Sequence, residues 1–593
     1  MPLPSKILIA NRGEIAIRVM RTCRELGITT VAVYSDLDRS AAHTRYADEA
    51  YALGGQTAAE SYLNTERILE VIAQSGAQAV HPGYGFFAEN ADFARTLIEA
   101  GAIWIGPPPA AIDIMGDKIS SRKAAAASDV ASVPGTLEPI QSTDEIVAFG
   151  EEFGWPVAIK AAYGGGGKGL KVVHGPDEVE AGFESATREA AAYFGRSEAY
   201  LERYLTRPRH IEIQVFADQH GNAVWLGERD CSTQRRHQKL IEESPAFGLD
   251  DATRTAMGEA AVKVALGCGY TNAGTVEMLY QDGEFWFLEM NTRLQVEHCV
   301  TEMVTSLDLV AEQIRVAAGE PLSFTQADIE RRGHSIECRI NAEDATRGFL
   351  PSPGTITLLR APGGPGVRWD GGYESGDEIS QYYDNLVGKL VVWAPDRARA
   401  VQRVVRALRE LRVEGIATTV PAHLALIEHP DFVAGAHSTK WVEEEIDLAA
   451  LMAAQAPVAP VATETAEGED TPALVERTVP VEVNGKQFTV KVWMPDAPVV
   501  AASGGATAKR ARPRPAATGG GAGSGTITAP MQGTIVKVLV AEGDVVEVGQ
   551  GVLVLEAMKM ENHINAETAG TVKEIRVGPG DTVGPGDVLV VIE

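Results

Sequence analysis

The C-terminal end of the chain repeats itself, and this repeat constrains the fold more than any other feature. Residues 533–556 and 570–593 align without gaps at a period of 37, and nine of the 24 aligned positions are identical. The identities include Gly543-Asp544 and Gly580-Asp581. Two β-rich halves of equal length predict a small, pseudo-symmetric flattened barrel.

One lysine lies between the two halves of this repeat. Lys559 is the centre of Ala557-Met-Lys-Met-Glu561, on the connection between the related strands. A tight turn there would hold the amine in solvent, behind a long tether, where it can carry a group between two places. An ordinary surface lysine is the alternative, and the flanking methionines and the repeat argue against it.

Two segments poor in core-forming residues precede the repeat. Residues 448–474 are rich in Ala, Pro, Thr and Glu and contain no aromatic residue, which predicts a flexible linker. Residues 499–525 form a second linker, whose roughly 25 residues would span about 25–30 Å if fully flexible. Between the linkers, Val481–Met494 carries Asn484-Gly485 between two alternating runs, which predicts a β hairpin.

The first hundred residues alternate between strand and helix patterns. In residues 14–26 the apolar side chains recur at helical spacing, which predicts a helix with one apolar face that ends at Gly27. Strands are predicted on either side of this helix and further along, at residues 6–10, 28–34, 79–81 and 103–106. This alternation predicts an open parallel α/β sheet. The first turn, Asn11-Arg-Gly-Glu, is not GxGxxG, so it gives little support to a dinucleotide site.

The middle of the chain has a different pattern. Strands without intervening helices predict an antiparallel-rich α+β domain; they are expected at residues 199–204, 210–217, 223–227, 274–279 and 284–289. With 593 residues, the chain exceeds what one hydrophobic core usually serves, so two to four domains are expected.

Composition excludes several classes of protein. The net charge is 53 − 81 = −28, which argues against nucleic acid or an anionic membrane as the main partner. A membrane-spanning helix needs about 18 consecutive apolar residues, and no apolar run in the sequence is that long. The N-terminus also lacks the features of a signal peptide. The five cysteines are scattered and never CxxC-spaced, so neither a disulfide framework nor a zinc site is expected. These features predict a reduced cytoplasmic protein.

A glycine cluster, Tyr163-Gly-Gly-Gly-Gly-Lys-Gly169, follows a predicted strand at 155–160. Glycines let backbone N–H groups approach phosphate oxygens and also form mobile lids. The cluster is not a Walker A motif, and tight loops use glycine too. Lys118 and Lys160 can meet phosphate charge, although a solvated lysine is the alternative for each.

Two resemblances give these features a common meaning. Glu556-Ala-Met-Lys-Met is similar to the biotin-attachment signature of biotin carboxyl-carrier domains; lipoyl domains share the fold but typically carry Asp-Lys-Ala. About residues 3–446 resemble ATP-grasp enzymes of the biotin carboxylase type. The stretches that carry this resemblance are Ile9–Ala16, His81–Phe86, Ala158–Gly169, Arg229–Lys239, Phe287–His298 and Ile336–Asp344.

The resemblance implies a fold of mixed α/β and α+β class with five regions. They are an N-terminal α/β domain at 1–117, an ATP-grasp nucleotide domain at 118–325 with a lid at about 133–203, a C-terminal carboxylase domain at 326–446, linkers with a small β segment at 447–525, and an all-β biotinyl/lipoyl-like carrier at 526–593.

The nucleotide and metal sites follow from the motifs. Glu289 and Asn291 share one face of a strand and Glu277 lies on a neighbouring strand, an oxygen set that suits Mg²⁺, or Mn²⁺, bridging ATP phosphates. Pairing of these carboxylates with arginines is the alternative. The resemblance implies that Lys118, Lys160 and Gly165, Gly166 and Gly167 hold phosphates, and that adenosine is surrounded by Glu202, Leu205, His210, Gln234 and His237.

The resemblance also implies a bicarbonate and biotin site. Lys239 and Arg293 would hold bicarbonate, with hydrogen bonds from Gln295 and the backbone of Val296. Glu297 would be the general base that prepares bicarbonate to attack the γ-phosphate of ATP, giving carboxyphosphate and then CO₂. Arg339 would stabilise the enolate oxygen of biotin, and Tyr84 would contact biotin.

These assignments predict an acyl-CoA carboxylase alpha subunit that carboxylates biotin on Lys559. Nothing after residue 447 is large enough for a carboxyltransferase, so a separate beta subunit is implied, with Val481–Met494 as a docking segment and a large α–β assembly. Biotin protein ligase is the other expected protein partner. The acyl-CoA would be short, such as acetyl-CoA or propionyl-CoA, with methylcrotonyl-CoA or longer chains as alternatives. Another ATP-grasp ligase with a borrowed carrier, or a dead biotinylated scaffold, are the rival hypotheses.

A few positions depart from the common biotin carboxylase pattern. Cys299 stands where a proline is usual, which predicts a looser turn after the catalytic segment, and Phe247 replaces a second proline. Ala88 and Arg203 replace a serine and a lysine. None of these changes removes a catalytic group.

Overall fold

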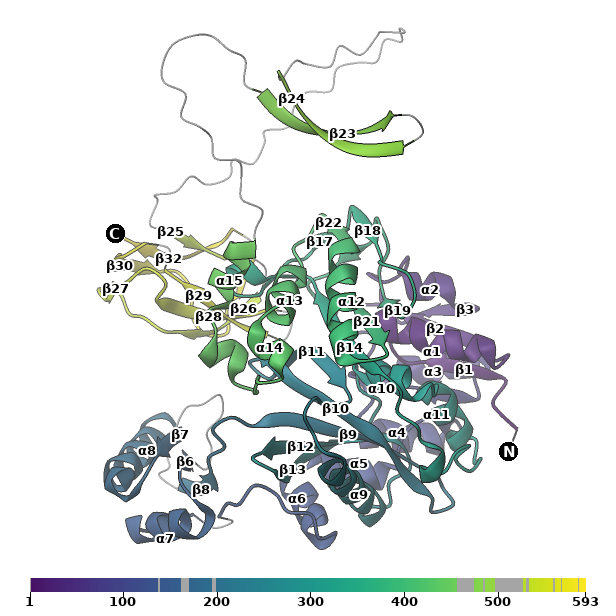
Figure 1. The fold of residues 1–593 in the computed structure, drawn as a ribbon, viewed down its shortest axis with the longest axis horizontal. Helices are drawn as coiled ribbons and strands as arrows, with labels where there is room; N and C mark the ends of the chain where they lie inside the picture. Colours follow the sequence, from purple (N-terminus) through teal and green to yellow (C-terminus); the bar gives the residue numbers. More distant parts are fainter. Residues whose placement is uncertain are drawn as a thin grey trace. The chain divides into compact units, whose positions relative to one another are not determined.

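The computed structural model describes residues 2–136, 139–161, 170–194, 199–455, 474–483, 486–495, 526–529, 533–557, 560–566, 568–584 and 586–593 (Figure 1). The glycine loop 163–169 and Lys559 therefore lie outside the described residues. The chain divides into two units, one of residues 1–455 with 526–593 and one of residues 456–525.

The N-terminal region is a parallel sheet of order β3-β2-β1-β4-β5, which confirms the predicted α/β domain. Its strands are β1 (Lys6–Ile9), β2 (Thr29–Tyr34), β3 (Glu49–Ala52), β4 (Ala79–His81) and β5 (Ile103–Trp104). Its helices are α1 (Gly13–Glu25), α2 (Ala42–Tyr46), α3 (Thr65–Ser75), α4 (Ala91–Glu99) and α5 (Pro109–Gly116). The predicted stripe of α1 is buried against β1 and β2, as apolar burial requires of an amphipathic helix.

A second sheet, antiparallel throughout, carries the functional residues. Its order is β13-β12-β9-β10-β11-β14-β21-β19. The strands are β9 (Arg209–Ala217), β10 (Ala223–Arg235), β11 (Gln238–Ser244), β12 (Asn272–Gln281), β13 (Glu284–Asn291), β14 (His334–Asn341), β19 (Val367–Gly371) and β21 (Leu386–Ala394). Because β11 pairs with β14, strands on both sides of the expected boundary at residue 325 form one continuous sheet.

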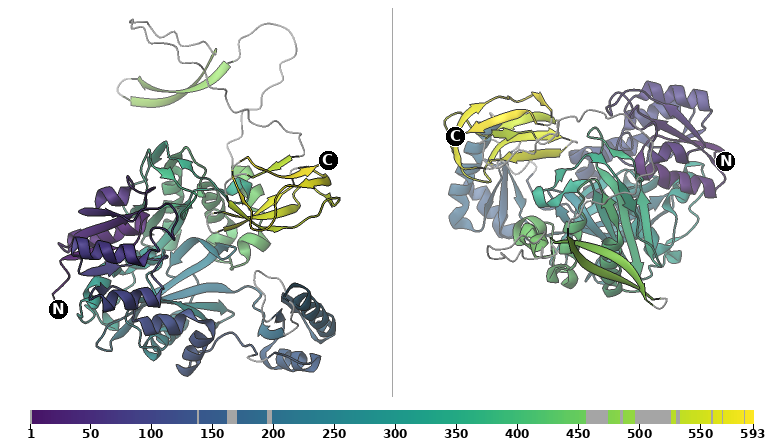
Figure 2. Two further views of the ribbon diagram at one scale, coloured as in Figure 1. Left: turned by 180° about the vertical axis from the view of Figure 1, so that it is seen from behind. Right: turned by 90° about the horizontal axis from the view of Figure 1, so that it is seen from above.

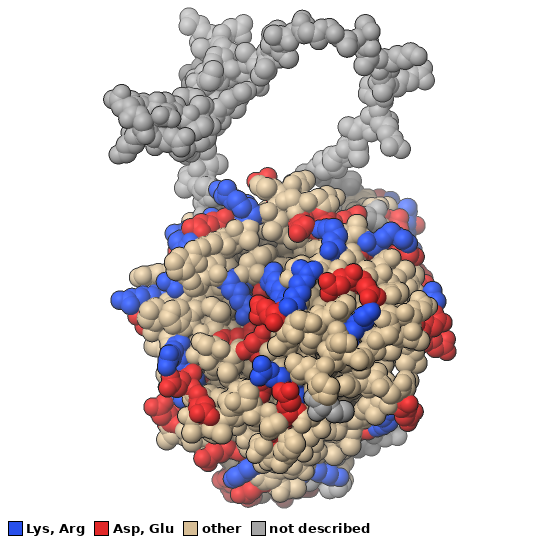
Figure 3. All heavy atoms as spheres, turned by 90° about the vertical axis from the view of Figure 1, so that its right-hand side faces the viewer, with Lys and Arg blue, Asp and Glu red and all other residues tan. Residues whose placement is uncertain are grey.

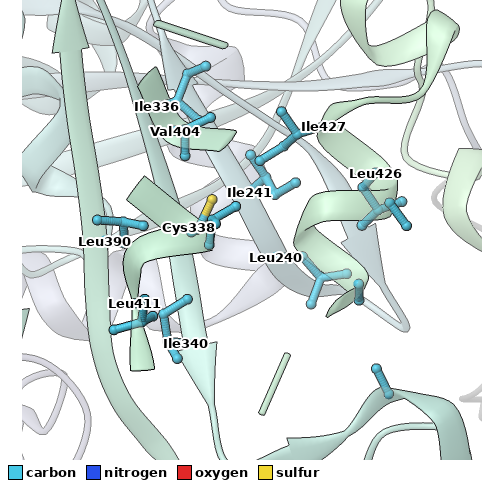
Figure 4. Close-up of a cluster of buried hydrophobic side chains, with 14 of the residues drawn as sticks. Leu240, Ile241, Ile336, Cys338, Ile340, Leu390, Val404, Leu411, Leu426 and Ile427 are labelled. Atoms are coloured by element: carbon cyan, nitrogen blue, oxygen red, sulfur yellow. The ribbon is translucent and has the colours of Figure 1, made fainter. Parts of the chain in front are cut away.

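Helices cover this sheet. They are α6 (Lys118–Ala127), α9 (Asp251–Gly267), α10 (His298–Thr305), α11 (Leu309–Ala317) and α12 (Arg397–Glu410), followed by α13 (Val420–Ile427) and α14 (Pro430–Ala434). Figure 4 shows α12 and α13 packed on β11, β14 and β21 through Leu240, Cys338, Val404 and Leu426, all fully buried. Short strand pairs, β15 (Glu343–Asp344) with β16 (Leu350–Pro351), β17 (Gly354–Thr355) with β20 (Glu378–Ile379) and β18 (Leu358–Arg360) with β22 (Arg412–Glu414), complete this part.

The predicted lid forms a small layer of its own. Strands β6 (Val157–Ala161), β7 (Leu170–Val173) and β8 (Ala199–Arg203) make an antiparallel sheet of order β7-β6-β8. Helices α7 (Thr143–Phe153) and α8 (Val179–Phe194) pack on it around a separate apolar cluster.

The linker expected from residue 448 begins later. Residues 448–455 form helix α15 (Leu448–Gln455), which corrects that prediction. The backbone N–H of Ala450 donates to the carboxylate of Asp447 at the start of this helix. Leu448 and Met452, one turn apart, are buried in the same cluster as α13. An alanine-rich segment has high helix propensity, and this apolar pair gives it a surface to pack on.

The hairpin predicted between the two linkers is present. Strands β23 (Leu474–Val483) and β24 (Lys486–Pro495) pair antiparallel, with Val483 opposite Lys486. The strands are longer than the predicted segment, and the Asn484-Gly485 turn lies outside the described residues.

The C-terminal repeat folds as a pseudo-symmetric pair of sheets, as predicted (Figure 2). The orders are β25-β32-β30-β27 and β29-β28-β26-β31, and corresponding strands are offset by the repeat. The strands are β25 (Thr526–Thr528), β26 (Gly533–Val538), β27 (Val545–Val546), β28 (Gly551–Ala557), β29 (Met560–Asn565), β30 (Gly570–Ile575), β31 (Thr582–Val583) and β32 (Val588–Ile592).

The hydrogen bonds of the two halves repeat as well. The N–H of Gly543 donates to the carbonyl of Val572, and the N–H of Gly580 donates to that of Ile535, at 2.8 and 2.7 Å. Both glycines have φ near 95°, where an L side chain would be strained, so the Gly-Asp identities are turn requirements. The last residue pair between β28 and β29 joins Ala557 and Met560, and Lys559 lies in the part of the sequence between them that the structure does not describe.

Acidic and basic side chains are interspersed on the face that Figure 3 shows. All five cysteines are buried, and none of them forms a disulfide. Among the helices of the described residues, none combines the length and the apolar character that crossing a bilayer would need.

Candidate functional site

Six neighbouring strands of the central sheet each present a polar side chain to one site. In sheet order these side chains are Asn291 on β13, Glu277 on β12, Glu212 on β9, Arg229 on β10, Lys239 on β11 and Arg339 on β14. Glu212 lies opposite both Glu277 and Arg229 in the strand register. Since directly opposed residues of antiparallel strands share a face, the register places acidic and basic groups in one row.

Lys239 is the centre of this row. Its Nζ lies 2.6 Å from Oε2 of Glu212, 3.0 Å from Oε1 of Glu277 and 2.7 Å from Oε1 of Glu297. Burial alone would lower the pKa of Lys239, but the charges of Glu212, Glu297 and Glu277 outweigh it and raise the pKa well above its usual value. Lys239 is therefore a fixed cation at neutral pH.

Glu297 lies between two cations. Its second oxygen, Oε2, is 2.8 Å from Nη2 of Arg339, while Oε1 faces Lys239. Burial raises the pKa of Glu297, and Lys239, Arg339 and Arg229 together bring it well below the usual range. The carboxylate is thus held ionised inside the protein, where it can accept a hydrogen bond or a proton from an incoming acid.

Arg339 bridges two carboxylates. Its Nε donates to Oε1 of Glu242 at 2.6 Å and its Nη2 donates to Glu297. Burial opposes the charge of Arg339, but Glu242, Glu297 and Glu337 raise its pKa above the usual value. The planar guanidinium can make both contacts at once, which a lysine cannot.

The arginine of this row, Arg229, is fully buried. Arg229 donates to Glu212 at 2.5 Å, to Gln295 at 2.6 Å, and also to Gln214, Thr301 and Thr275. Gln295 in turn donates to Glu277 at 2.8 Å. These bonds fix Gln295 and Glu212 in position beside Lys239.

The expected metal ligands are adjacent in the structure. Glu277 lies opposite Glu289 in the register of β12 and β13, and Nδ2 of Asn291 is 2.9 Å from Oε1 of Glu277. Glu289 is exposed, whereas Glu277 and Asn291 are buried. His210 and Lys239 overcome the effect of burial and hold the pKa of Glu277 well below its usual range. An ionised carboxylate, a second carboxylate and an amide oxygen at the edge of the site fit Mg²⁺.

The expected bicarbonate contacts surround the same centre. Arg293 bonds Glu89 at 3.0 Å and Asn291 at 2.8 Å, next to the Glu277 cluster. The carbonyl of Val296 accepts a hydrogen bond from the buried Lys389 at 2.9 Å, which fixes the peptide next to Glu297. Lys389 also lies 3.2 Å from Glu14, whose carboxylate accepts a hydrogen bond from Tyr84.

The residues expected to bind the nucleotide lie in several different surroundings. Lys160 pairs with Glu202 across β6 and β8, and Leu205 belongs to an apolar cluster with Val133 and Trp286. His210 instead contacts Glu277 at 3.1 Å, so it belongs to the metal set as much as to the adenosine set. Gln234 is buried at the end of β10. The side chain of Lys118 and the residues Gly165, Gly166 and Gly167 lie outside the described structure.

An open cavity of about 620 Å³ lies beside the row. Its lining includes Tyr84, Glu14, Arg12, His237 and Gln238. His237 thus lines the same cavity as the predicted biotin contact Tyr84. The cavity has room for a bicyclic ligand and combines aromatic walls with a few polar groups, as small-molecule sites usually do.

Several residues of the site were not predicted from the sequence. Glu212 and Glu242 hold Lys239 and Arg339, and Lys389 holds the Val296 peptide. Little in the sequence indicates them: Glu212, for example, lies in His210–Ala217, where polar and apolar residues alternate as in a strand with one face in water.

The departure at Cys299 does not disturb α10. Cys299 is fully buried in the first turn, and its Sγ is 3.3 Å from Oδ2 of Asp370. In the described geometry α10 begins at His298, directly after Glu297. Phe247 is partly exposed under the guanidinium of Arg397, away from the row of charges.

Four family models match successive parts of the chain. They are the biotin carboxylase N-terminal domain at residues 4–112, the carbamoyl-phosphate synthase L chain ATP-binding domain at 117–325, the biotin carboxylase C-terminal domain at 337–444 and the biotin-requiring enzyme domain at 525–592.

Whole-length relatives have the same arrangement. The biotin-dependent acyl-coenzyme A carboxylase alpha3 subunit of Mycobacterium leprae is 48% identical over 99% of this chain and 98% of its own length. The propionyl-CoA carboxylase alpha chain of Ruegeria pomeroyi is 42% identical over 99% of this chain and all of its own.

A solved structure matches the carboxylase part. The biotin carboxylase domain of Hydrogenobacter thermophilus 2-oxoglutarate carboxylase, in complex with MgADP, ADP and bicarbonate, has a TM-score of 0.66 and 46% identity. The match covers 75% of this chain and 98% of that one. The protein therefore belongs to the family of biotin-dependent acyl-CoA carboxylase alpha subunits, in which an ATP-dependent biotin carboxylase and a biotin carrier domain share one chain.

Proposed function

We propose that Glu297 is the general base of the biotin carboxylase reaction and that Lys239 and Arg339 are its two electrostatic partners. The observation that carries this proposal is the placement of each Glu297 oxygen 2.7–2.8 Å from one of these cations in a buried site. Bicarbonate is an anion with an acidic proton. It can bind the positive groups Lys239 and Arg293 and present its O–H to Glu297.

Gln295 and the Val296 peptide complete this pocket. Arg229 and Lys389 hold them from behind, so the donors are oriented before a substrate arrives. Once Glu297 takes the proton, a bicarbonate oxygen can attack the γ-phosphate of ATP with ADP as the leaving group. The carboxyphosphate so formed breaks down to CO₂ and phosphate inside the closed site. Arg339 then has its Nη2 available for an anionic oxygen of the acceptor.

Nucleotide and metal binding are proposed on the neighbouring strands. Glu277, Glu289 and Asn291 would hold Mg²⁺, which supplies charge neutralisation at the ATP phosphates when bound. Lys118, Lys160 and Gly165–Gly167 would bind phosphate oxygens, with Glu202, Leu205, His210 and Gln234 near the nucleoside. We place His237 with Tyr84 at the biotin cavity because both line it.

Biotin would be attached to Lys559 by biotin protein ligase. Biotin supplies a ureido nitrogen that accepts the carboxyl group. The linker predicted at 499–525 would let the carrier reach two sites by raising the effective concentration of its lysine. We propose the cytoplasm as the location, which fits the buried, unpaired cysteines.

The second site is proposed to belong to a carboxyltransferase beta subunit in a large α–β assembly. The hairpin of β23 and β24 would be the docking element, since a two-stranded hairpin is rarely stable without a partner surface. The relatives named above make a short acyl-CoA, propionyl-CoA first, the favoured acceptor.

The test is ADP release by the purified chain with MgATP, with and without bicarbonate and free biotin. Turnover that requires both additions and disappears in Glu297→Gln supports the proposal. ADP release that ignores both additions, or that survives in Glu297→Gln, contradicts it. A Glu89→Gln variant is a useful comparison, because Glu89 touches Arg293 and Thr292 but not Glu297.

A further inference from the structure

A buried pair of glutamates lies directly behind Arg339. Glu242 on β11 and Glu337 on β14 are opposite each other in the strand register, and both are fully buried. Directly opposed side chains of antiparallel strands lie on one face, with Cβ atoms about 5 Å apart. The two carboxyl groups therefore share one small volume.

The hydrogen bonds of this pair are incomplete. Oε1 of Glu242 accepts from Nε of Arg339, but Oε2 of Glu242 has no partner, and neither oxygen of Glu337 has one. A buried carboxylate without a single hydrogen bond is too costly to stay ionised. Two facing carboxylates are also not both ionised when they lie so close together.

The charged and titratable groups around Glu337 come from every element packed at this point. They are Glu242 from β11, Arg339 from β14, Lys389 from β21, Glu297 from the segment before α10, and Cys299 from α10. Lys389 is engaged by Val296 and Glu14, and Arg339 by Glu242 and Glu297. Both cations therefore already have partners other than Glu337.

We propose that Glu242 and Glu337 hold one proton between them and that this pair is the positioning device of Arg339. Glu242 is the ionised member and anchors Nε of Arg339. Glu337 is the protonated member, and its O–H donates to the otherwise unpartnered Oε2 of Glu242. The arrangement satisfies the free oxygen of Glu242 and places a single negative charge behind the guanidinium.

Burial supports this assignment, since it raises the pKa of Glu337 well above the usual range and that of Glu242 to about 7. Glu242 and Glu337 titrate as a unit, so the shared proton that the pair loses as the pH rises cannot be assigned to one of the two residues. Its loss puts a second negative charge beside Arg339 and draws the guanidinium away from Glu297. The inference rests on the proposed roles of Arg339 and Glu297, and it adds a protonation state on which those roles depend.

The first experiment measures the proton directly, without turnover. Infrared difference spectra of the full-length chain at neutral pH compare the wild type with Glu337→Gln. We expect the variant to lose one protonated-carboxyl band. Glu243→Gln is the matched control, because Glu243 is the next residue of β11 and is ionised. Although Glu243 is buried, His334 and Arg397 keep its pKa well below the usual range. If Glu337→Gln loses an ionised-carboxylate band instead, the proposal is wrong.

The second experiment measures the consequence for catalysis. The pH profile of biotin-dependent kcat should have its alkaline limb displaced upward by about one unit or more in Glu337→Gln, because glutamine keeps a donor but has no proton to lose. Glu242→Gln should lower biotin-dependent kcat about tenfold or more, since it removes the anchoring charge, with KM for ATP within about twofold. Glu242→Asp should restore part of this loss.

The outcomes separate this inference from the proposed function. A wild type without bicarbonate- and biotin-dependent turnover overturns the proposed function, whatever the infrared spectra show. A wild type that turns over while Glu337→Gln keeps both the protonated-carboxyl band and the original alkaline limb overturns the shared proton. Equal kcat in Glu242→Gln and wild type overturns the positioning role.

Discussion

Nζ of Lys239 lies 2.7 Å from Oε1 of Glu297, and both groups are charged and almost fully buried. Because Lys239 lowers the pKa of Glu297, the Glu297 carboxylate is a weak base for as long as the ammonium faces no other anion. Bicarbonate is such an anion. Under the proposed function, bicarbonate bound to Lys239 would weaken the attraction of the ammonium for Glu297 and so raise the basicity of that carboxylate. The ion pair would then couple substrate binding to activation of the base.

Replacement of Lys239 by glutamine should expose this coupling. Without the ammonium, Glu212, Glu277 and Glu297 lose a shared cation, so the pKa of Glu297 rises. Glu297 can act as a base only above its pKa, where it is ionised. If the substitution raises this pKa, then as the pH falls the enzyme should lose activity at a higher pH than the wild type does. We expect the acid limb of kcat/KM for bicarbonate to shift to higher pH and the maximum to fall about tenfold or more. An unshifted acid limb would show that Lys239 does not set the basicity of Glu297.

Replacement of Arg339 by lysine should separate the biotin step from ATP binding. Lysine keeps the positive charge but cannot reach Glu242 and Glu297 together. Biotin-dependent turnover should fall by about 10², while KM for ATP should stay close to the wild-type value. Initial-rate kinetics with varied biotin and varied ATP distinguish the two. A parallel loss of ATP affinity would place Arg339 in the nucleotide site.

The predicted site residues came from separate stretches of sequence, and the central sheet brings most of them onto neighbouring strands. Local pattern was enough to find β9, β12 and β13 within two residues of their ends, because each is a run of β-forming residues between turns. It was not enough to pair β11 with β14, since a register between Glu242 and Glu337 depends on contacts nearly a hundred residues apart. The continuity of the sheet across residue 325 therefore came only from the structure.

Glu212 shows why some functional residues escaped prediction. In His210–Ala217 the charged or polar residues alternate with apolar ones, and this pattern normally means that the polar face meets water. Here that face is covered by α10 and by the segment before it, so Glu212 is fully buried between Arg229 and Lys239. Helix α15 was missed for the related reason that its stability depends on packing against the cluster around α13.

Lys559→Arg should remove biotin from the chain and leave the carboxylase intact. Arginine keeps the charge but offers no amine for amide formation. We expect intact-mass measurement to show no biotin increment, with ADP release on free biotin within about twofold of the wild type, because the carboxylase has its own core. Biotinylation that persists in Lys559→Arg would mean that another lysine is the attachment site.

Arg229→Met should be among the most destabilising single substitutions in the carboxylase. It removes the cation that pairs with Glu212 and leaves Gln295, Thr275 and Gln214 without a donor in a fully buried position. Breaking a buried pair by removing one partner costs about 3–5 kcal/mol. Arg409→Met is the matched control, since Arg409 pairs with Glu428 at 2.7 Å on the exposed surface, where a pair contributes about 0–1 kcal/mol. Urea unfolding of both variants measures the difference, and equal losses would contradict this account.

Buried histidines should make the carboxylase lose stability in mild acid. Desolvation lowers the pKa of His43, His81 and His423 to about 4 and that of His298 to about 3. The unfolded chain, with histidine near its usual pKa of about 6.5, binds protons that the folded chain excludes between about pH 6.5 and 4.

The stability that these histidines contribute is thus fully present above pH about 6.5 and declines as the pH falls, by up to about 1.4 kcal/mol per pH unit for each group. His81→Gln should reduce this slope, because glutamine can keep a hydrogen bond to Gln313 and has no proton to gain. Urea midpoints at pH values between 4 and 7 measure the slope. A wild-type stability that does not change over this range, or a His81→Gln slope equal to that of the wild type, would show that His81 is protonated in the folded protein.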